Sequence, residues 1–378
     1  EHSKIIDMDW LTAIVTVADD GGSTGRLIEE FDVLAPGDIR HCMVALSDQD
    51  ERISRLFSHR FKSEGDLGGH SVGNLLLIAF TELNNGNFPK AIQEASKVLA
   101  IRGRILPVTL EHATLCAELE DGEIVEGESQ IPKRRNRDPI KRVFLIPRKN
   151  SKKRERNGEI LEKQDYRFQA HQETVDAIHQ ADAITIGPGS LYTSILPNLV
   201  VKEVADAIKE VNVPRIYICN IMSQPGETDG YSVSDHVKAI VNHSDFLPDY
   251  VLVNKEPAPK DIIEKYMKEE LQEHFARIRL HADEAMDTLD EGSGYVSETL
   301  TDLLRTITQI SQDTSHMVDT SKVQVMYNPE VDDLGDISVI QEEILACANI
   351  VDRGVEKMVI RHDAEKLAGA IAEILWKH

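Results

Sequence analysis

Two adjacent carboxylates, Asp19 and Asp20, stand directly before a glycine-rich stretch in TAIVTVADDGGSTGRL, residues 12–27. A carboxylate can accept hydrogen bonds from ribose hydroxyls, or bind Mg²⁺ together with the phosphates of a ligand. Glycines let a ligand approach main-chain N–H groups closely. The stretch therefore predicts a polar ligand site, with Asp20 as the candidate metal ligand. Its candidate contacts are Asp19, Asp20, Gly21, Gly22, Ser23, Gly25 and Arg26.

Further polar, glycine-rich stretches have the same character. Helix amino ends with free N–H groups attract anions, so each is a candidate phosphate site. Two precede helical patterns and contribute Gly37, Asp38, Arg40, Gly69, His70, Ser71 and Asn74. The others follow short apolar segments and contribute Gly187, Pro188, Gly189, Ser190, Thr193, Asn220, Gln224, Glu227, Thr228, Asp229 and Arg361.

A single glycine turn between a strand and a helix is an ordinary connector. Parallel strands, however, bring their carboxyl ends to one edge of a sheet, where ligands of α/β proteins bind. We therefore expect one elongated cleft on that edge, sized for a nucleotide-like diphosphate.

Other kinds of chemistry have weaker support. His236 and His243 are seven residues apart on one helical face, about 10 Å along the axis, too far to share a metal without other ligands. We expect His236, beside Asp235, to make a helix-start contact. The spacing shows no Ser-His-Asp or reactive-cysteine arrangement, and the serines of the glycine turns are predicted to bind phosphate, not to act as nucleophiles.

The elements that must position these residues alternate along the chain, which predicts an α/β fold with a mainly parallel sheet and helices on both faces. Expected strands are 12–17, 104–109, 183–187, 214–219, 249–253 and 356–360. Expected helices are 38–47, 71–82, 88–99, 170–180, 199–210, 232–243 and 363–376. Short alternating segments within 104–146 predict an antiparallel patch.

Two stretches have the character of insertions. Residues 133–158 concentrate positive charge, which favours a solvated hairpin over an anion- or partner-binding arm. Apolar stripes within 262–310 predict a helical hairpin, which packs on the domain or on a second subunit or partner protein. The predicted units are a core over 1–268 with a β insertion at 104–160, a helical insertion over 269–322, and a completion of the core over 323–378.

Composition narrows the class of partner and compartment. The chain has 378 residues and a formal net charge of −23, which argues against binding to nucleic acid or an anionic membrane. No apolar run approaches the ~20 residues of a membrane span. Four widely spaced cysteines suggest reduced thiols. We expect a cytoplasmic protein.

Several of these stretches, TAIVTVADDGGSTGRL, PGDIRHCMVALS, LGGHSVGNLLL, residues 186–201 and YICNIMSQPGETDGYSVSDH, resemble the YvcK (UPF0052) family of bacterial gluconeogenesis factors. These are relatives of the CofD phospholactate transferases. The resemblance covers most of 10–268 and returns at 355–376. It implies a Rossmann-like domain that binds a UDP-sugar such as UDP-N-acetylglucosamine, with a role in carbon metabolism and cell shape. By position, it implies that Tyr266 and Arg361 contact the UDP-sugar.

Three functions remain open from the sequence. The first is a non-catalytic UDP-sugar sensor, with NAD or GDP as an alternative occupant of the cleft. The second is a CofD-like, Mg²⁺-dependent transferase, in which Asp19 or Asp20 holds the metal. The third is a scaffold that binds another protein, or itself, through the helices of 262–310.

Overall fold

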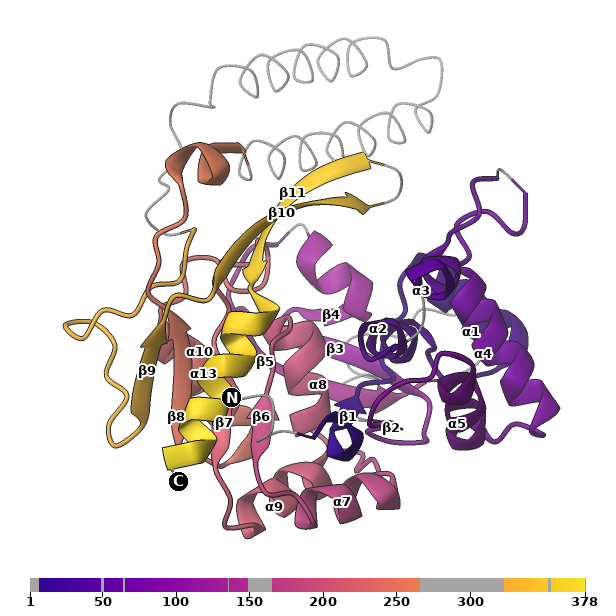
Figure 1. Cartoon of the computed structure of the whole chain (residues 1–378), viewed down its shortest axis with the longest axis horizontal. Coiled ribbons are helices and arrows are strands. Elements are labelled where there is room, and N and C mark those ends of the chain that lie inside the picture. The colour runs from indigo at the N-terminus through magenta and orange to yellow at the C-terminus, as the bar shows by residue number, and fades with distance from the viewer. Residues whose placement is uncertain are drawn as a thin grey trace, which may run out of the picture.

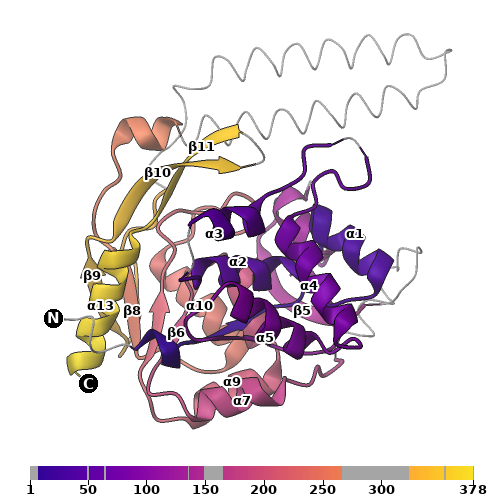
Figure 2. The ribbon, with the colours of Figure 1, turned by 45° about the vertical axis from the view of Figure 1, so that its right-hand side comes forward.

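The computed structural model describes residues 7–48, 51–63, 65–134, 136–148, 165–265, 323–352 and 355–377. Its centre is a four-stranded parallel sheet of β6 (Ile184–Ile186), β7 (Arg215–Ile218), β8 (Tyr250–Asn254) and β9 (Ser338–Glu342), in that order. Helices lie on both sides of this sheet (Figures 1 and 2). The predicted α/β class is therefore confirmed.

The side chains of β7 alternate between two cores, as the pleat of a strand requires. Ile216 and Ile218 pack with α13 (Ala364–Lys377) on one face. Tyr217 and the following Cys219 belong to the larger core on the other face. That core also holds side chains of α7 (Gln172–His179), α8 (Leu196–Leu199), α9 (Lys202–Glu210) and α10 (Val233–Ser244).

A second parallel pair, β1 (Thr12–Val15) and β2 (Arg104–Pro107), carries the amino-terminal helices. These are α1 (Gly22–Phe31), α2 (Gly37–Ala45), α3 (Glu51–Ser58), α4 (Val72–Leu83) and α5 (Phe88–Val98). A separate core joins Val15 to Ile39, Leu77 and Ile92 on these helices. Helix α1 packs instead in a smaller core, through Leu27. Neither α1 nor α3 was predicted from the sequence.

The antiparallel patch is also present, as β4 (Ile124–Glu126), β3 (Ala113–Leu119) and β5 (Ile140–Pro147). A 3-10 helix, η3 (Glu128–Lys133), follows β4. The expected strand 356–360 is part of β11 (Val355–His362), which pairs antiparallel with β10 (Leu345–Asp352) and not with the parallel sheet. Neither β9 nor β10 was predicted.

The basic stretch 133–158 is not simply a solvated hairpin where the structure describes it. Arg134 is buried. Strand β5 pairs with β3 along the length of both strands, and apolar side chains of β5 lie in the core. The predicted helical insertion 269–322 lies outside the described residues, as does 149–164. Within the described part of the chain, no helix is long and apolar enough to cross a bilayer.

Candidate functional site

The turn after β1 is held by Asp19. Its Oδ1 accepts a hydrogen bond from the Gly21 N–H (2.8 Å), and its Oδ2 accepts one from the Thr24 hydroxyl (2.7 Å). A Cβ at Gly37 would lie 2.0 Å from the same Oδ2, so only glycine lets α2 begin there. Burial raises the pKa of Asp19, and Asp38 and Asp20 add to the rise. Asp19 therefore positions the starts of α1 and α2.

Asp20 connects this turn to the antiparallel patch. Its Oδ1 accepts a hydrogen bond from the Ser129 N–H (2.8 Å) at the start of η3. A Cβ at Gly127 would lie 2.5 Å from its Oδ2. The β1 turn and η3, about a hundred residues apart in the sequence, thus meet at one carboxylate.

Glu128 lies at the centre of the acidic part of the site, and the sequence analysis missed it. Burial, as the main cause, raises the pKa of Glu128 to about 8 together with the charges of Asp19, Asp20, Asp38 and Glu227, in that order. Together with Glu128 itself, these carboxylates come from four separate stretches of chain. Their common influence on Glu128 shows that the stretches converge. The signal for Glu128 was present in EGES, a strand end followed by glycine and a carboxylate.

The amino ends of α1 and α4 form one side of the site. The Ser23 hydroxyl and His70 Nδ1 are hydrogen-bonded at 2.9 Å, and both residues are buried. Ser71 caps α4 by accepting the Asn74 N–H. Arg40, buried on α2, donates from Nε to Asn74 Oδ1 (3.0 Å). Burial lowers the pKa of Arg40 to about 10.

The glycine turn after β6 forms the opposite side. Gly187 has a φ of +92°, which favours glycine, and Ser190 precedes the π-helix η4 (Leu191–Ile195). The Asn220 side-chain amide donates to the Gly189 carbonyl (2.9 Å), and that of Gln224 donates to Ser190 Oγ (2.6 Å). Side chains that follow β7 therefore hold the turn that follows β6.

The loop after β7 returns to the acidic centre at Glu227. This buried carboxylate accepts hydrogen bonds from the Tyr192 N–H and, at 3.4 Å, from the Thr193 hydroxyl. Burial raises its pKa to about 7. Thr228 and Asp229 stabilise the loop internally. The Thr228 side chain accepts a hydrogen bond from the Gln224 N–H, and that of Asp229 accepts one from the Gly226 N–H.

Arg134 fastens this loop, a role that sequence reasoning missed. Its guanidinium donates to the carbonyls of Ile131, Gly226 and Asp138. A basic run such as KRRNR is typical of exposed chain, so nothing in the sequence marked one of its arginines as buried.

Arg361 lies in β11, with an exposed side chain. The next residue, His362, donates from Nε2 to the Cys219 carbonyl at 3.1 Å, one residue before Asn220. The end of β11 therefore lies against the end of β7, but no hydrogen bond among the described residues joins the Arg361 side chain to the other candidates. Tyr266 lies outside the described residues.

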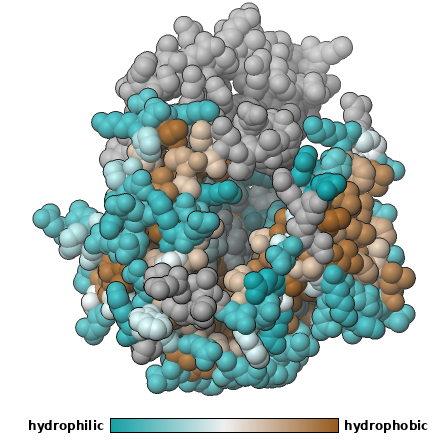
Figure 3. Space-filling model, viewed as in Figure 1, coloured by the Kyte–Doolittle hydropathy of each residue, from teal (hydrophilic) through white to brown (hydrophobic). Residues whose placement is uncertain are grey.

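Figure 3 shows a hollow between the side of the molecule that carries β10, β11 and α13 and the side that carries the amino-terminal helices. A different recess, of about 840 Å³, lies at the amino ends of β7, β8 and β9 and is lined by Arg215, Tyr250 and Ser338. None of the predicted contacts lines that recess. We place the candidate site at the carboxyl ends, where the polar contacts converge.

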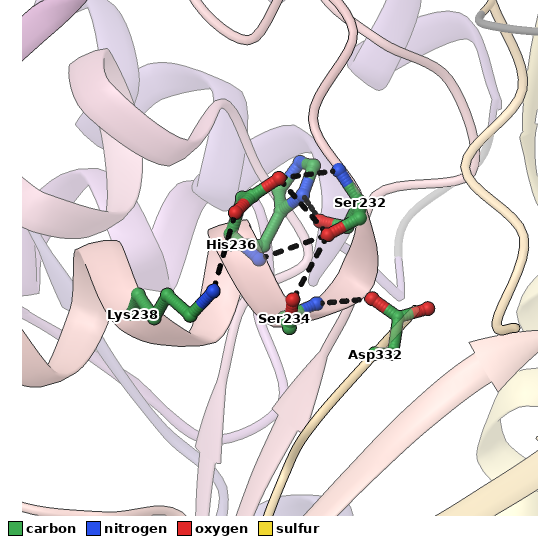
Figure 4. Close-up of polar contacts among 6 residues, drawn as sticks. Ser232, Ser234, His236, Lys238 and Asp332 are labelled. Atoms are coloured by element: carbon green, nitrogen blue, oxygen red, sulfur yellow. Dashed lines mark hydrogen bonds and ion pairs between the residues drawn. The ribbon is translucent and has the colours of Figure 1, made fainter. Parts of the chain in front are cut away.

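The two histidines of α10 are not metal ligands of one site. His236 Nδ1 donates to the Ser232 carbonyl at 2.8 Å, at the capped start of α10 (Figure 4). His243 Nε2 instead accepts the Val143 N–H. Among the described residues, no three His, Cys, Asp or Glu side chains could hold one metal ion. A Mg²⁺ ion on Asp20 would therefore need the phosphates of a ligand to complete its shell.

Comparisons with known proteins agree with this architecture. The family model of 2-phospho-L-lactate transferase CofD matches residues 4–290. A gluconeogenesis factor of Halalkalibacterium halodurans is 47% identical over 263 residues, which are 69% of this chain and 75% of that protein. The gluconeogenesis factor of Bacillus subtilis is 47% identical over 261 residues, 68% of this chain and 75% of that protein.

Solved structures of similar fold come from a related family. A crystal structure of a UPF0052-family protein from Bacillus halodurans has a TM-score of 0.70 and 36% identity, and the match covers 98% of this chain and 94% of that one. The chain therefore belongs to the CofD family, is similar in sequence to bacterial gluconeogenesis factors, and shares its fold with a protein of the UPF0052 family.

Proposed function

We propose that the chain binds a nucleotide sugar of the UDP-N-acetylglucosamine type at the strand-end site. We further propose that it acts through this binding as a regulatory protein of central carbon metabolism and cell morphogenesis. The relatives named gluconeogenesis factors support the metabolic part of the proposal.

Buried polar atoms without partners carry the proposal. Asn220 Oδ1 and Gln224 Oε1 have no hydrogen-bond partner among the described residues. A buried polar atom left unsatisfied costs about 1–3 kcal/mol. Ligand hydroxyl and amide groups would satisfy both atoms, and a nucleotide sugar offers both kinds of group.

The glycine turn supports a diphosphate next to these atoms. Gly189 and Ser190 present main-chain N–H groups at the start of η4, held in place by Asn220 and Gln224. Main-chain N–H groups in such a turn bind phosphate oxygens. Arg361 lies in β11, the end of which lies against the end of β7, and its guanidinium would add a bidentate contact to phosphate.

The raised pKa values reconcile the acidic centre with an anionic ligand. With pKa values of about 8 and about 7, Glu128 is mostly protonated near neutral pH, and Glu227 carries about half of its full negative charge. A protonated carboxyl group can donate to a ligand oxygen. Asp38 and Asp20 would accept from sugar or ribose hydroxyls.

Calorimetric titration with UDP-N-acetylglucosamine tests the proposal. We expect saturable binding by the intact chain, and a loss of about 10-fold or more in Arg361→Ala and in Asn220→Ala. The matched control is Arg167→Ala, which removes the same charge at an exposed position before α7. Absence of binding by the intact chain, or equal loss in the control, would refute the proposal.

A CofD-like transferase is the second candidate, favoured by one further observation. Glu128 has a pKa near neutrality and is influenced by Asp20, the candidate Mg²⁺ ligand. Such a group can give or take a proton during group transfer. Turnover of a nucleotide-activated phospholactate donor, lost in both Glu128→Gln and Asp20→Asn, would favour this function over sensing alone.

A further inference from the structure

A group of basic side chains lies at the amino ends of α1 and α4. Arg26 on α1 donates from Nη2 to the Gly68 carbonyl, and Arg60 donates from Nη1 to the next carbonyl, that of Gly69 (3.0 Å). The two guanidinium groups are therefore bound to the carbonyls of consecutive residues. Both lie close enough to His70 to lower its pKa, after burial as the main cause, while Glu30 opposes them.

The helices beneath this group add donors of their own. The hydrogen bond between Ser23 and His70 joins the first turn of α1 to the residue before the cap of α4. Two helix amino ends thus contribute positive potential at one place. Asn74, in the first turn of α4, is 1% exposed, and its Nδ2 has no partner among the described residues.

Within the described part of the chain, no carboxylate neutralises the positive charges of these two arginines. No carboxylate there forms an ion pair with Arg26 or Arg60, and no acceptor other than the two carbonyls takes their N–H groups. Each guanidinium offers five donors in a planar fork, so most of them remain for a ligand. In a chain of net charge −23, this is a local site for an anion.

We infer that Arg26, Arg60 and His70, above the amino ends of α1 and α4, form a second anion site that binds a phosphate group. A tetrahedral phosphate oxyanion matches two adjacent guanidinium forks and a buried amide donor. The ligand is either inorganic phosphate or the terminal group of a phosphate monoester. This inference goes beyond the proposed function, because it requires no nucleotide and uses residues on the opposite side of the acidic centre from the glycine turn.

Titration with inorganic phosphate, glycerol 3-phosphate and glycerol tests the inference in a phosphate-free buffer. We expect binding of one or both phosphate compounds, none of glycerol, and a loss of about 10-fold or more in Arg26→Ala and in Arg60→Ala. The compound that binds more tightly identifies the source of the phosphate. Arg55→Ala, which removes the same charge from the exposed side of α3, should bind like the unaltered chain.

Arg60→Lys keeps the positive charge but loses the planar guanidinium fork, so it should bind phosphate more weakly than the unaltered chain. It tests the site if Arg60→Ala fails to fold. Thermal melting of every variant confirms folding. Absence of phosphate binding by the unaltered chain, or equal loss in Arg55→Ala, would overturn the inference.

Competition separates this inference from the nucleotide-sugar proposal. We expect saturating phosphate to leave binding of UDP-N-acetylglucosamine in place. If phosphate displaces the nucleotide sugar and Arg60→Ala abolishes both, the arginines belong to the diphosphate site and the second site does not exist. If phosphate binds and the nucleotide sugar does not, the inference stands and the proposed function fails.

Discussion

Replacing Glu128 by glutamine should change how the stability of the protein depends on pH. In the folded chain, burial and the neighbouring carboxylates raise the pKa of Glu128 from 4.5 to about 8. The unfolded chain therefore releases this proton at a lower pH than the folded chain. The free energy of unfolding must then fall as the pH rises from about 4.5 to about 8, and stay lower above that.

The size of the effect follows from the size of the pKa difference. One pKa unit corresponds to about 1.4 kcal/mol, so the full difference would give an upper limit of ~5 kcal/mol. Glu128 is only partly buried, and water screens its interactions with its neighbours. We therefore expect Glu128→Gln, which cannot ionise, to stabilise the protein by about 2 kcal/mol at about pH 9 and by much less at about pH 5.

Urea unfolding of both proteins at these two pH values measures the effect. The control is Glu120→Gln, an exposed glutamate in the turn after β3, which should leave the pH dependence unchanged. If the unaltered chain and Glu128→Gln lose stability equally between the two pH values, the carboxylates do not converge on Glu128, and the description of the acidic centre is wrong.

Three further substitutions test packing and buried hydrogen bonds, one at the site and two away from it. Gly37→Ala should lower the free energy of unfolding by about 1–3 kcal/mol, because the new Cβ would overlap the Asp19 carboxylate. An unchanged free energy of unfolding in urea would contradict this contact. Gly369→Ala, in α13 with no atom within 4 Å of the new Cβ, should instead stabilise by about 0.5–1 kcal/mol, and a loss would mean that α13 packs differently. Asp332→Ala should lower the free energy of unfolding by about 2 kcal/mol or more, because buried Asp332 accepts the N–H group of Ser234 (Figure 4) and that of Asn328. Asp333→Ala, at the neighbouring exposed position, should lower it far less, and equal losses would refute the role of Asp332.

Much of the fold could be predicted, because apolar periodicity marks the strands and helices that pack against a core. The strand at 12–17 and the helix at 71–82 correspond to β1 and α4. Helix α1 was missed because its first turn, GSTG, has poor helix formers. Its start is instead fixed by Asp19 and by packing of Leu27 and Ile28, which a local pattern does not reveal.

The candidate site was predicted only in part. The strand-end stretches lie together as the parallel topology requires, since Asn220 and Gln224 contact the turn after β6. Glu128 and Arg134 come from the antiparallel patch, whose position over the strand ends has no periodic signal in the sequence. The importance of Glu128 depends on the charge of Asp20, and that of Arg134 on its contact with Gly226. Both partners are about a hundred residues away, so the sequence alone could not reveal them.

A crystal structure of the chain with UDP-N-acetylglucosamine would test the central claim most directly. We predict diphosphate oxygens within hydrogen-bond distance of the Ser190 main chain, and ligand hydroxyl or amide groups on Asn220 and Gln224. A nucleotide sugar bound in the recess at the amino ends of β7, β8 and β9, or contacting none of these residues, would contradict the account.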